Sequence, residues 1–221
     1  TLTALRTSAA SALAATLLAR PGAATAAVLG PGVQGRGHVR ALAHALPLEE
    51  VRLWGRDGDA AGRAAADLDR EVGPRVVAAG SVAEAVAGAD VVAACTASPS
   101  PLVEAEQLAP GATVISIGSI TPDRSEVGLG VLAAAGTVVV DHRPAALEHA
   151  GPVIQALDAG LLTEADLVEL GEVATGRHPG RRGPDDLVFY NSLGLGVQDA
   201  AAAWAIVERA GRQGVGTRVP L

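Results

Sequence analysis

A glycine-rich hexapeptide near the N-terminus has the spacing of a phosphate-binding loop. Gly30-Pro31-Gly32-Val33-Gln34-Gly35 fits the pattern Gly-x-Gly-x-x-Gly and lies between an apolar run and a predicted helix. In such loops the first glycine permits a tight turn, the second lets the backbone approach a pyrophosphate, and the third brings the helix close to the sheet. The pyrophosphate charge then lies at the positive end of the helix. A chance match in a glycine- and alanine-rich chain is the alternative. We expect a bound dinucleotide with these neighbours: Gly30, Gly32, Val33, Gln34 and Gly35.

The residues after the second apolar run bear on which dinucleotide would bind. An NAD site usually carries an acidic residue there for the ribose 2′-hydroxyl, whereas this chain has Trp54-Gly55-Arg56-Asp57. The guanidinium of Arg56 could pair with a 2′-phosphate, which favours NADP(H) over NAD(H). Two alternatives stay open: Arg56 is a solvated loop residue, or Asp57 takes the acid's place in a shifted register.

The other elements of the chain indicate a sheet that would position this loop. Apolar runs predict strands at residues 26–29, 51–54, 76–77, 90–96, 113–117 and 137–140, and helices are expected at 33–45, 59–69 and 82–87. Strands that alternate with helices pair in parallel through right-handed crossovers. We therefore predict one α/β domain over residues 1–221, a doubly wound Rossmann-type parallel sheet with flanking helices. Further helices are expected at residues 3–19 and 193–210.

Composition argues against several classes of function. The net charge of −7 disfavours nucleic-acid binding, because a phosphate-backbone reader is usually basic. No run of about 20 apolar residues predicts a membrane span. The single cysteine, Cys95, allows no internal disulfide, and no Cys/His spacing suggests zinc. We expect a cytoplasmic protein with no metal, nucleic-acid or membrane partner. The chain has no lysine, so it supplies no lysine base.

Six segments carry a more specific pattern than the glycine loop alone. They are residues 5–10 (LRTSAA), the glycine loop continued to His38, residues 54–56 (WGR), 138–141 (VVVD), 169–172 (ELGE) and 192–194 (SLG). In order and spacing they resemble the ornithine cyclodeaminase/mu-crystallin family along nearly the whole chain. The resemblance implies hydride transfer between a nicotinamide cofactor and a small amino or imino acid, as in cyclodeaminases and ketimine reductases.

The resemblance also implies roles for three residues. Arg6 matches the family arginine that grips the substrate carboxylate, Thr7 matches a neighbour of the cofactor phosphate, and Asp141 matches the catalytic carboxylate. Asp141 follows a strand of valines, so it should project from the carboxyl edge of the sheet, where open α/β folds bind ligands. There it could hold an ammonium group or exchange a proton with an imine nitrogen. The alternatives are a helix N-cap for Asp141 and a solvated helix charge for Arg6.

Other polar residues are weaker candidates. Thr96 and Ser119 are predicted cofactor neighbours, and Cys95 is interpreted as a buried small hydrophobe. His38 is expected to pack or cap within the first crossover helix. His142 should point away from Asp141 along an extended chain, toward the surface.

Members of the family carry about a hundred further residues, an ordinary domain size, before the helix that opens this chain. We expect the domain that they form, which supplies substrate-binding groups, to be absent here, and Asn191 stands where many relatives have lysine. The apolar faces of the two terminal helices predict a homodimer. Three hypotheses remain: an imine-reducing or cyclodeaminating enzyme, a cofactor-binding protein without catalysis, or a remnant that folds only with a partner.

Overall fold

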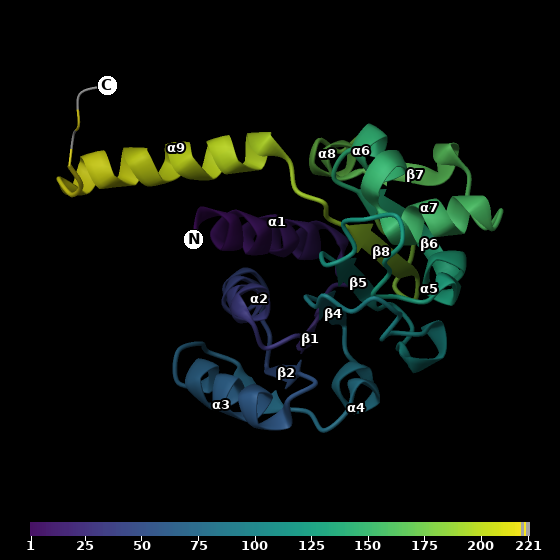
Figure 1. The fold of residues 1–221 in the computed structure, drawn as a ribbon, viewed down its shortest axis with the longest axis horizontal. Coiled ribbons are helices and arrows are strands. Elements are labelled where there is room, and N and C mark those ends of the chain that lie inside the picture. Colours follow the sequence, from purple (N-terminus) through teal and green to yellow (C-terminus); the bar gives the residue numbers. More distant parts are fainter. Residues whose placement is uncertain (218, 220–221) are drawn as a thin grey trace.

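The computed structural model describes residues 1–217 and 219, which form a parallel eight-stranded sheet flanked by helices (Figure 1). The strand order is β3-β2-β1-β4-β5-β8-β6-β7, and every neighbouring pair is parallel. The strands are β1 (Thr25–Leu29), β2 (Glu50–Trp54), β3 (Arg75–Ala78), β4 (Val91–Ala94), β5 (Thr113–Ser116), β6 (Ala135–Val140), β7 (Leu167–Glu169) and β8 (Leu187–Asn191). The predicted doubly wound Rossmann-type fold is confirmed.

Nine α-helices connect or extend these strands in the described part of the chain. They are α1 (Leu2–Leu18), α2 (Val33–Ala45), α3 (Gly58–Asp69), α4 (Val82–Val86), α5 (Leu129–Ala134), α6 (Arg143–His149), α7 (Gly151–Asp158), α8 (Leu170–Ala174) and α9 (Gly196–Gln213). Two short 3₁₀ turns, Ala105–Gln107 and Glu164–Asp166, complete the set. Up to β6, the predicted elements agree with the observed strands and α-helices apart from α5, with shifts of a few residues at their ends.

The core lies on both faces of the sheet, as expected when helices cover both sides of parallel strands. Successive strand residues alternate between the two layers: Val28 packs with α1, α2 and α3 on one face, and Leu29 packs with α4 and other helices on the second face. With only 2% aromatic residues, both layers consist mainly of alanine, valine and leucine. Small side chains let helices and strands approach closely, which positions the strand ends rigidly.

Two strands, β7 and β8, were not predicted, and β8 lies between β5 and β6 although it comes last along the chain. It pairs with both neighbours and carries fully buried Phe189 and Tyr190. Because it follows a stretch rich in glycine and arginine, the local pattern there indicated a loop. The short helices α5 to α8 were also not predicted, since none is long enough to show a clear helical period.

The last helix begins three residues later than predicted. Gly194 has a φ of +88°, a left-handed conformation that ends any helical geometry before it, and Leu195 has extended backbone angles as the N-cap of α9. Gly214, also left-handed, ends the helix. The prediction of a helix over residues 193–210 was therefore displaced, since the SLG segment belongs to the connection from β8.

Helix α9 projects away from the body and runs alongside α1 only near its start (Figure 1). No residue of α9 is buried, and its exposed side chains include Trp204 and Val207. Among the described residues, no helix combines the length and the apolar character needed to cross a bilayer.

Candidate cofactor and substrate site

The glycine loop connects β1 to α2 at the point where the strand order reverses, between β1 and β4. Open α/β sheets bind ligands at this crevice. Gly30 has a φ of +110°, and a Cβ there would lie 2.5 Å from the Cys95 carbonyl oxygen. A Cβ on Gly35 would lie 1.7 Å from the Gly30 oxygen, whereas one on Gly32 would meet nothing within 4 Å. Gly30 and Gly35 are thus required by the fold, while Gly32 faces open space.

The start of α2 can accept an anion. Gly32 is the N-cap, no side chain caps the helix, and the first N–H groups of a helix have no partner within it. The positive end of the helix dipole lies at the same place. Nearby, the buried Oε1 of Gln34 has no hydrogen-bond partner in the described chain. Open space at Gly32, an uncapped helix and an unpaired amide fit the phosphates and polar groups of a dinucleotide.

Two cavities open on either side of this loop. The first, about 200 Å³, is lined by Thr3, Arg6, Thr7, Gln34, Cys95, Thr96, Ile117, Gly118, Ile120, Ser192 and Leu193. The second, about 240 Å³, is lined by Gly30, Pro31, Trp54, Gly55, Arg56, Thr96, Ala97, Ser98, Pro99 and Leu102. Each is smaller than the roughly 300–1,000 Å³ of a typical small-molecule site. A dinucleotide would have to extend through both, and Thr96 lines both.

The second cavity contains Arg56, exposed at the end of β2. Arg56 takes part in none of the ion pairs found among residues 1–217 and 219. Asp57 is the N-cap of α3, and its carboxylate accepts a hydrogen bond from the Ala60 N–H at 3.0 Å. A role for Asp57 at the cofactor ribose would compete with this cap. Gly55 packs against Pro31, which holds the end of β2 beside the glycine loop.

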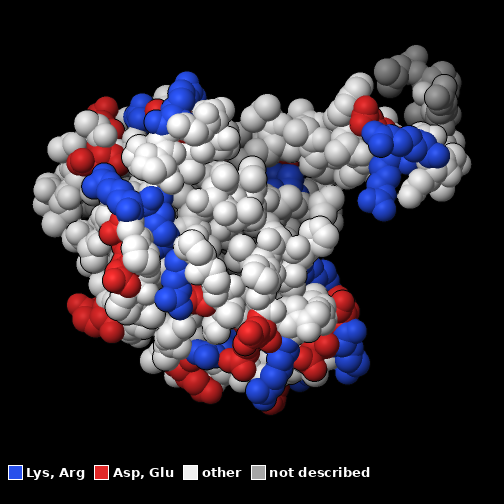
Figure 2. Space-filling model, turned by 180° about the vertical axis from the view of Figure 1, so that it is seen from behind, with Lys and Arg blue, Asp and Glu red and all other residues white. Residues whose placement is uncertain are grey.

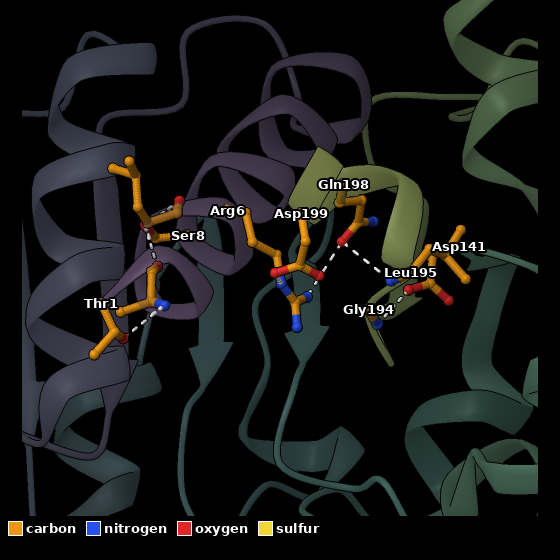
Figure 3. Close-up of polar contacts among 10 residues, drawn as sticks. Thr1, Arg6, Ser8, Asp141, Gly194, Leu195, Gln198 and Asp199 are labelled. Atoms are coloured by element: carbon orange, nitrogen blue, oxygen red, sulfur yellow. Dashed lines mark hydrogen bonds and ion pairs between the residues drawn. The ribbon is translucent and has the colours of Figure 1, made fainter. Parts of the chain in front are cut away.

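The first cavity contains Arg6, on the face of α1 that meets the start of α9 (Figure 3). Its guanidinium donates to Gln198 Oε1 at 3.2 Å, and Nε lies 3.4 Å from the Asp199 carboxylate. A Cβ on Gly194 would lie 2.2 Å from Arg6 Nη1, so the glycine leaves the room that the guanidinium occupies. Arg6 is therefore a paired cation at the cavity wall and not a freely solvated helix charge.

Asp141 lies on the opposite side of the Gly194–Leu195 turn from Arg6 (Figure 3). It follows β6, its Oδ2 accepts from the Gly194 N–H at 2.7 Å, and its buried Oδ1 has no partner in the described chain. Burial raises the pKa of this carboxyl, although hydrogen bonds from backbone N–H groups oppose the shift. Asp141 lines neither cavity. The N-cap alternative for Asp141 is wrong, because the cap of α6 is the exposed His142.

Buried polar atoms without partners gather at the ends of β6 and β8. Besides Asp141 Oδ1, they include the Tyr190 hydroxyl, both amide atoms of Asn191 and the Ser192 hydroxyl. Buried polar groups are nearly always hydrogen-bonded to protein, water or ligand. The cluster therefore marks a polar region at the ends of β6 and β8, in which the Tyr190 and Ser192 hydroxyls lie close enough to pair with each other. The sequence pointed to Asp141 and Asn191 separately, but not to Tyr190 or to the cluster, because β8 was not predicted.

The remaining candidates from the sequence lie around the cavities in different ways. Thr7 lines the first cavity, and Val33 is exposed at the start of α2. His38 is fully buried and bonds to Ser11 Oγ and the Gln34 carbonyl, which agrees with the expected packing role. Ser119 is buried and lines neither cavity.

A buried carboxylate that was not predicted connects the loops behind the first cavity. Glu126 is fully buried, and its oxygens accept hydrogen bonds from Thr96, Ser116 and Gly118. Its own N–H donates to Ser119 Oγ at 2.9 Å. The residue lies in a segment of turns between β5 and α5, where no local pattern singles out one acidic residue.

Comparison with known proteins places the chain beside nicotinamide-dependent imine reductases. The model of the ornithine cyclodeaminase/mu-crystallin family matches residues 1–214. A Δ1-pyrroline-2-carboxylate reductase of Bacillus cereus is 32% identical over 219 residues, or 99% of this chain and 67% of the relative. The ketimine reductase mu-crystallin of Mus musculus is 36% identical over 203 residues, or 91% of this chain and 60% of the relative.

A solved structure agrees in fold over the whole described chain. The Δ1-pyrroline-2-carboxylate reductase of Thermococcus litoralis, in complex with NADH and L-proline, has a TM-score of 0.93 and 28% identity. The match covers 99% of this chain and 68% of that one. This chain thus spans about 60 to 68% of the length of these relatives.

Proposed function

Because the chain belongs to the ornithine cyclodeaminase/mu-crystallin family, we propose that it binds a nicotinamide dinucleotide for hydride transfer at the amine or imine carbon of a small amino or cyclic imino acid. The observation that carries the proposal is the glycine loop at the switch point of the sheet: Gly32 faces open space, and other residues of the loop line two cavities. A cofactor-binding role without catalysis, or a chain that works only with a partner, would use the same loop. A cytoplasmic location belongs to the proposal and rests on cysteine usage alone.

The cofactor supplies the hydride, and the chain's own residues hold the reactants and move the proton. We assign Arg6 to the substrate carboxylate, since it is a cation at the wall of the first cavity. The substrate would replace the Asp199 and Gln198 contacts of its guanidinium. Thr7, Gln34 and Thr96 line the same cavity and are assigned to the cofactor, as are Val33 and the loop glycines.

Asp141 is assigned to proton exchange with the substrate nitrogen. Its raised pKa brings the carboxyl closer to the neutral range in which a general acid or base is effective. The buried Oδ1, which has no hydrogen-bond partner in the described chain, is the oxygen assigned to this exchange. Because the Gly194–Leu195 turn lies between Asp141 and Arg6, this role requires the turn to move or the substrate to reach around it.

We further infer a preference for NADP(H), which rests on the exposed guanidinium of Arg56 in the second cavity. Replacing Arg56 by Ala should weaken NADP(H) binding by about 10- to 150-fold, the equivalent of a charge-assisted hydrogen bond of about 1.5–3 kcal/mol. NAD(H) affinity should change less than about threefold, since NAD(H) has no 2′-phosphate. Fluorescence titration of both cofactors measures this, and equal losses for both would remove Arg56 from the account.

We also infer a homodimer. In Figure 2, charged groups gather over the lower and left parts of one face, while the area between them and α9 is mainly uncharged. Trp204 and Val207 on α9 are 68% and 65% exposed, and small side chains of α1 and α2 line a further groove. Apolar surface of this kind usually meets a partner, and a two-fold dimer is the commonest closed assembly.

Sedimentation velocity of the wild-type chain at micromolar concentration should therefore show a dimer. Replacing Trp204 by Arg should shift it toward monomer, because a charge would then be buried in the interface. The matched control is Leu161→Arg, because Leu161 is an exposed apolar residue just after α7 that belongs neither to α9 nor to the groove between α1 and α2. A wild-type chain that sediments as a monomer contradicts this inference.

A further inference from the structure

Glu126 is a fully buried carboxylate with four hydrogen-bond donors and no cation beside it. Oε1 accepts from the Thr96 N–H and hydroxyl, both at 2.6 Å, and Oε2 accepts from the Ser116 hydroxyl at 3.0 Å and the Gly118 N–H at 2.7 Å. None of the ion pairs among residues 1–217 and 219 includes Glu126. Its charge is held by neutral donors alone.

These donors match the ionised form of the side chain. Each oxygen faces one backbone N–H, which can only donate, and an ionised carboxylate is an acceptor with about four sites. A buried charge is costly unless it is fully hydrogen-bonded, and here the hydrogen bonds are complete. Glu126 is therefore a buried negative charge beside the ends of β4 and β5.

This charge lies directly behind the wall of the first cavity. Thr96 and Gly118, which bond to Glu126, both line that cavity, and a Cβ on Gly118 would lie 2.8 Å from Glu126 Oε1. The same negative charge adds to burial in raising the pKa of the Cys95 thiol, another lining residue. The field of Glu126 thus reaches groups that line the cavity.

We propose that the charge of Glu126 increases the affinity of this chain for the oxidised nicotinamide cofactor relative to its affinity for the reduced cofactor. The inference rests on the proposed cofactor function. The oxidised ring carries one positive charge and the reduced ring none, so a fixed negative charge behind the cavity stabilises only the oxidised form. Hydride transfer from a bound reduced cofactor to an imine carbon, with a proton going to the imine nitrogen, would leave a cationic nicotinamide ring. Glu126 would favour that direction of transfer without contacting either reactant.

The test compares dissociation constants for NADP⁺ and NADPH in the wild type, Glu126→Gln and Ser116→Ala. The Gln variant removes the charge and keeps the size of the side chain. The dissociation constant for NADP⁺ divided by that for NADPH should therefore rise by on the order of tenfold. Ser116→Ala removes one donor from the same network and keeps the charge, so its ratio should stay within about threefold of the wild type.

The outcomes separate this inference from the proposed function. A Gln variant that binds both forms with the wild-type ratio overturns the role of Glu126 and leaves cofactor binding intact. A wild-type chain that binds neither form overturns both. If circular dichroism shows that the Gln variant does not fold, Glu126→Asp takes its place. This variant keeps the charge, so the ratio of the NADP⁺ and NADPH dissociation constants should stay at the wild-type value even when both affinities fall. A tenfold change in that ratio contradicts the proposal.

Discussion

Replacing Asp141 by Asn should lower the turnover of a cyclic imine by roughly 10²- to 10⁴-fold, the usual effect of losing a general acid or base. Asn keeps the shape of the side chain and an oxygen that can accept the Gly194 N–H, but it cannot exchange a proton. Cofactor affinity should hardly change, since the glycine loop lies elsewhere on the sheet edge. The comparison requires a form of the protein that turns over the imine.

A stability measurement shows whether a loss of turnover could come from unfolding of the Asn variant. Because burial raises the pKa of Asp141 above that of an unfolded carboxyl, its ionised form is less favourable in the fold, and a neutral Asn should not destabilise the chain at neutral pH. The melting temperature of the Asn variant should therefore match or exceed the wild type. Unchanged imine reduction by a folded Asn variant would remove Asp141 from the mechanism.

Replacing Gly32 by Ala should weaken cofactor binding by at least about tenfold and leave the fold intact. Its φ of −75° suits any residue, and a Cβ there meets nothing within 4 Å in the chain itself. The methyl group would instead enter the space where the pyrophosphate approaches the backbone. Gly35→Ala would give a less informative result, because a Cβ 1.7 Å from the Gly30 oxygen disrupts the loop.

Gly62→Ala is the matched control for Gly32→Ala. Gly62 lies inside α3, and a Cβ there also meets nothing within 4 Å. This change should leave cofactor affinity unaltered and stabilise the helix by roughly 0.5–1 kcal/mol, because Ala is the better helix former. Loss of affinity in both variants would point to a general effect on the fold.

The part of the fold that surrounds the glycine loop could be predicted because its signals are local. Apolar runs predicted β1, β2 and β4 within one or two residues, and the loop between β1 and α2 combined the right spacing with the right neighbours. The position of β8 could not be predicted, since its place between β5 and β6 depends on pairing with strands far away in the sequence.

In the candidate site, too, some features could be predicted from the sequence and others depend on contacts between distant segments. Arg6, Thr7 and Asp141 were chosen by resemblance, and the structure adds what resemblance could not: Arg6 is paired with Asp199, and a turn lies between Arg6 and Asp141. Glu126 had no sequence signal, because its importance depends on donors brought together by two separate loops. Long-range packing, which local patterns do not record, decides both features.

Trp54 offers the most direct test of dinucleotide binding at the glycine loop. It lines the second cavity, whereas the chain's other tryptophan, Trp204, lies on the projecting helix α9. NADPH should be titrated into a Trp204→Phe chain, alone and with Gly32→Ala or Gly62→Ala added, while tryptophan emission is recorded. We predict saturable quenching of Trp54 in the parent and Gly62→Ala chains, and a midpoint at least about tenfold higher with Gly32→Ala. Absence of saturable quenching, or identical curves for all three chains, would contradict the account.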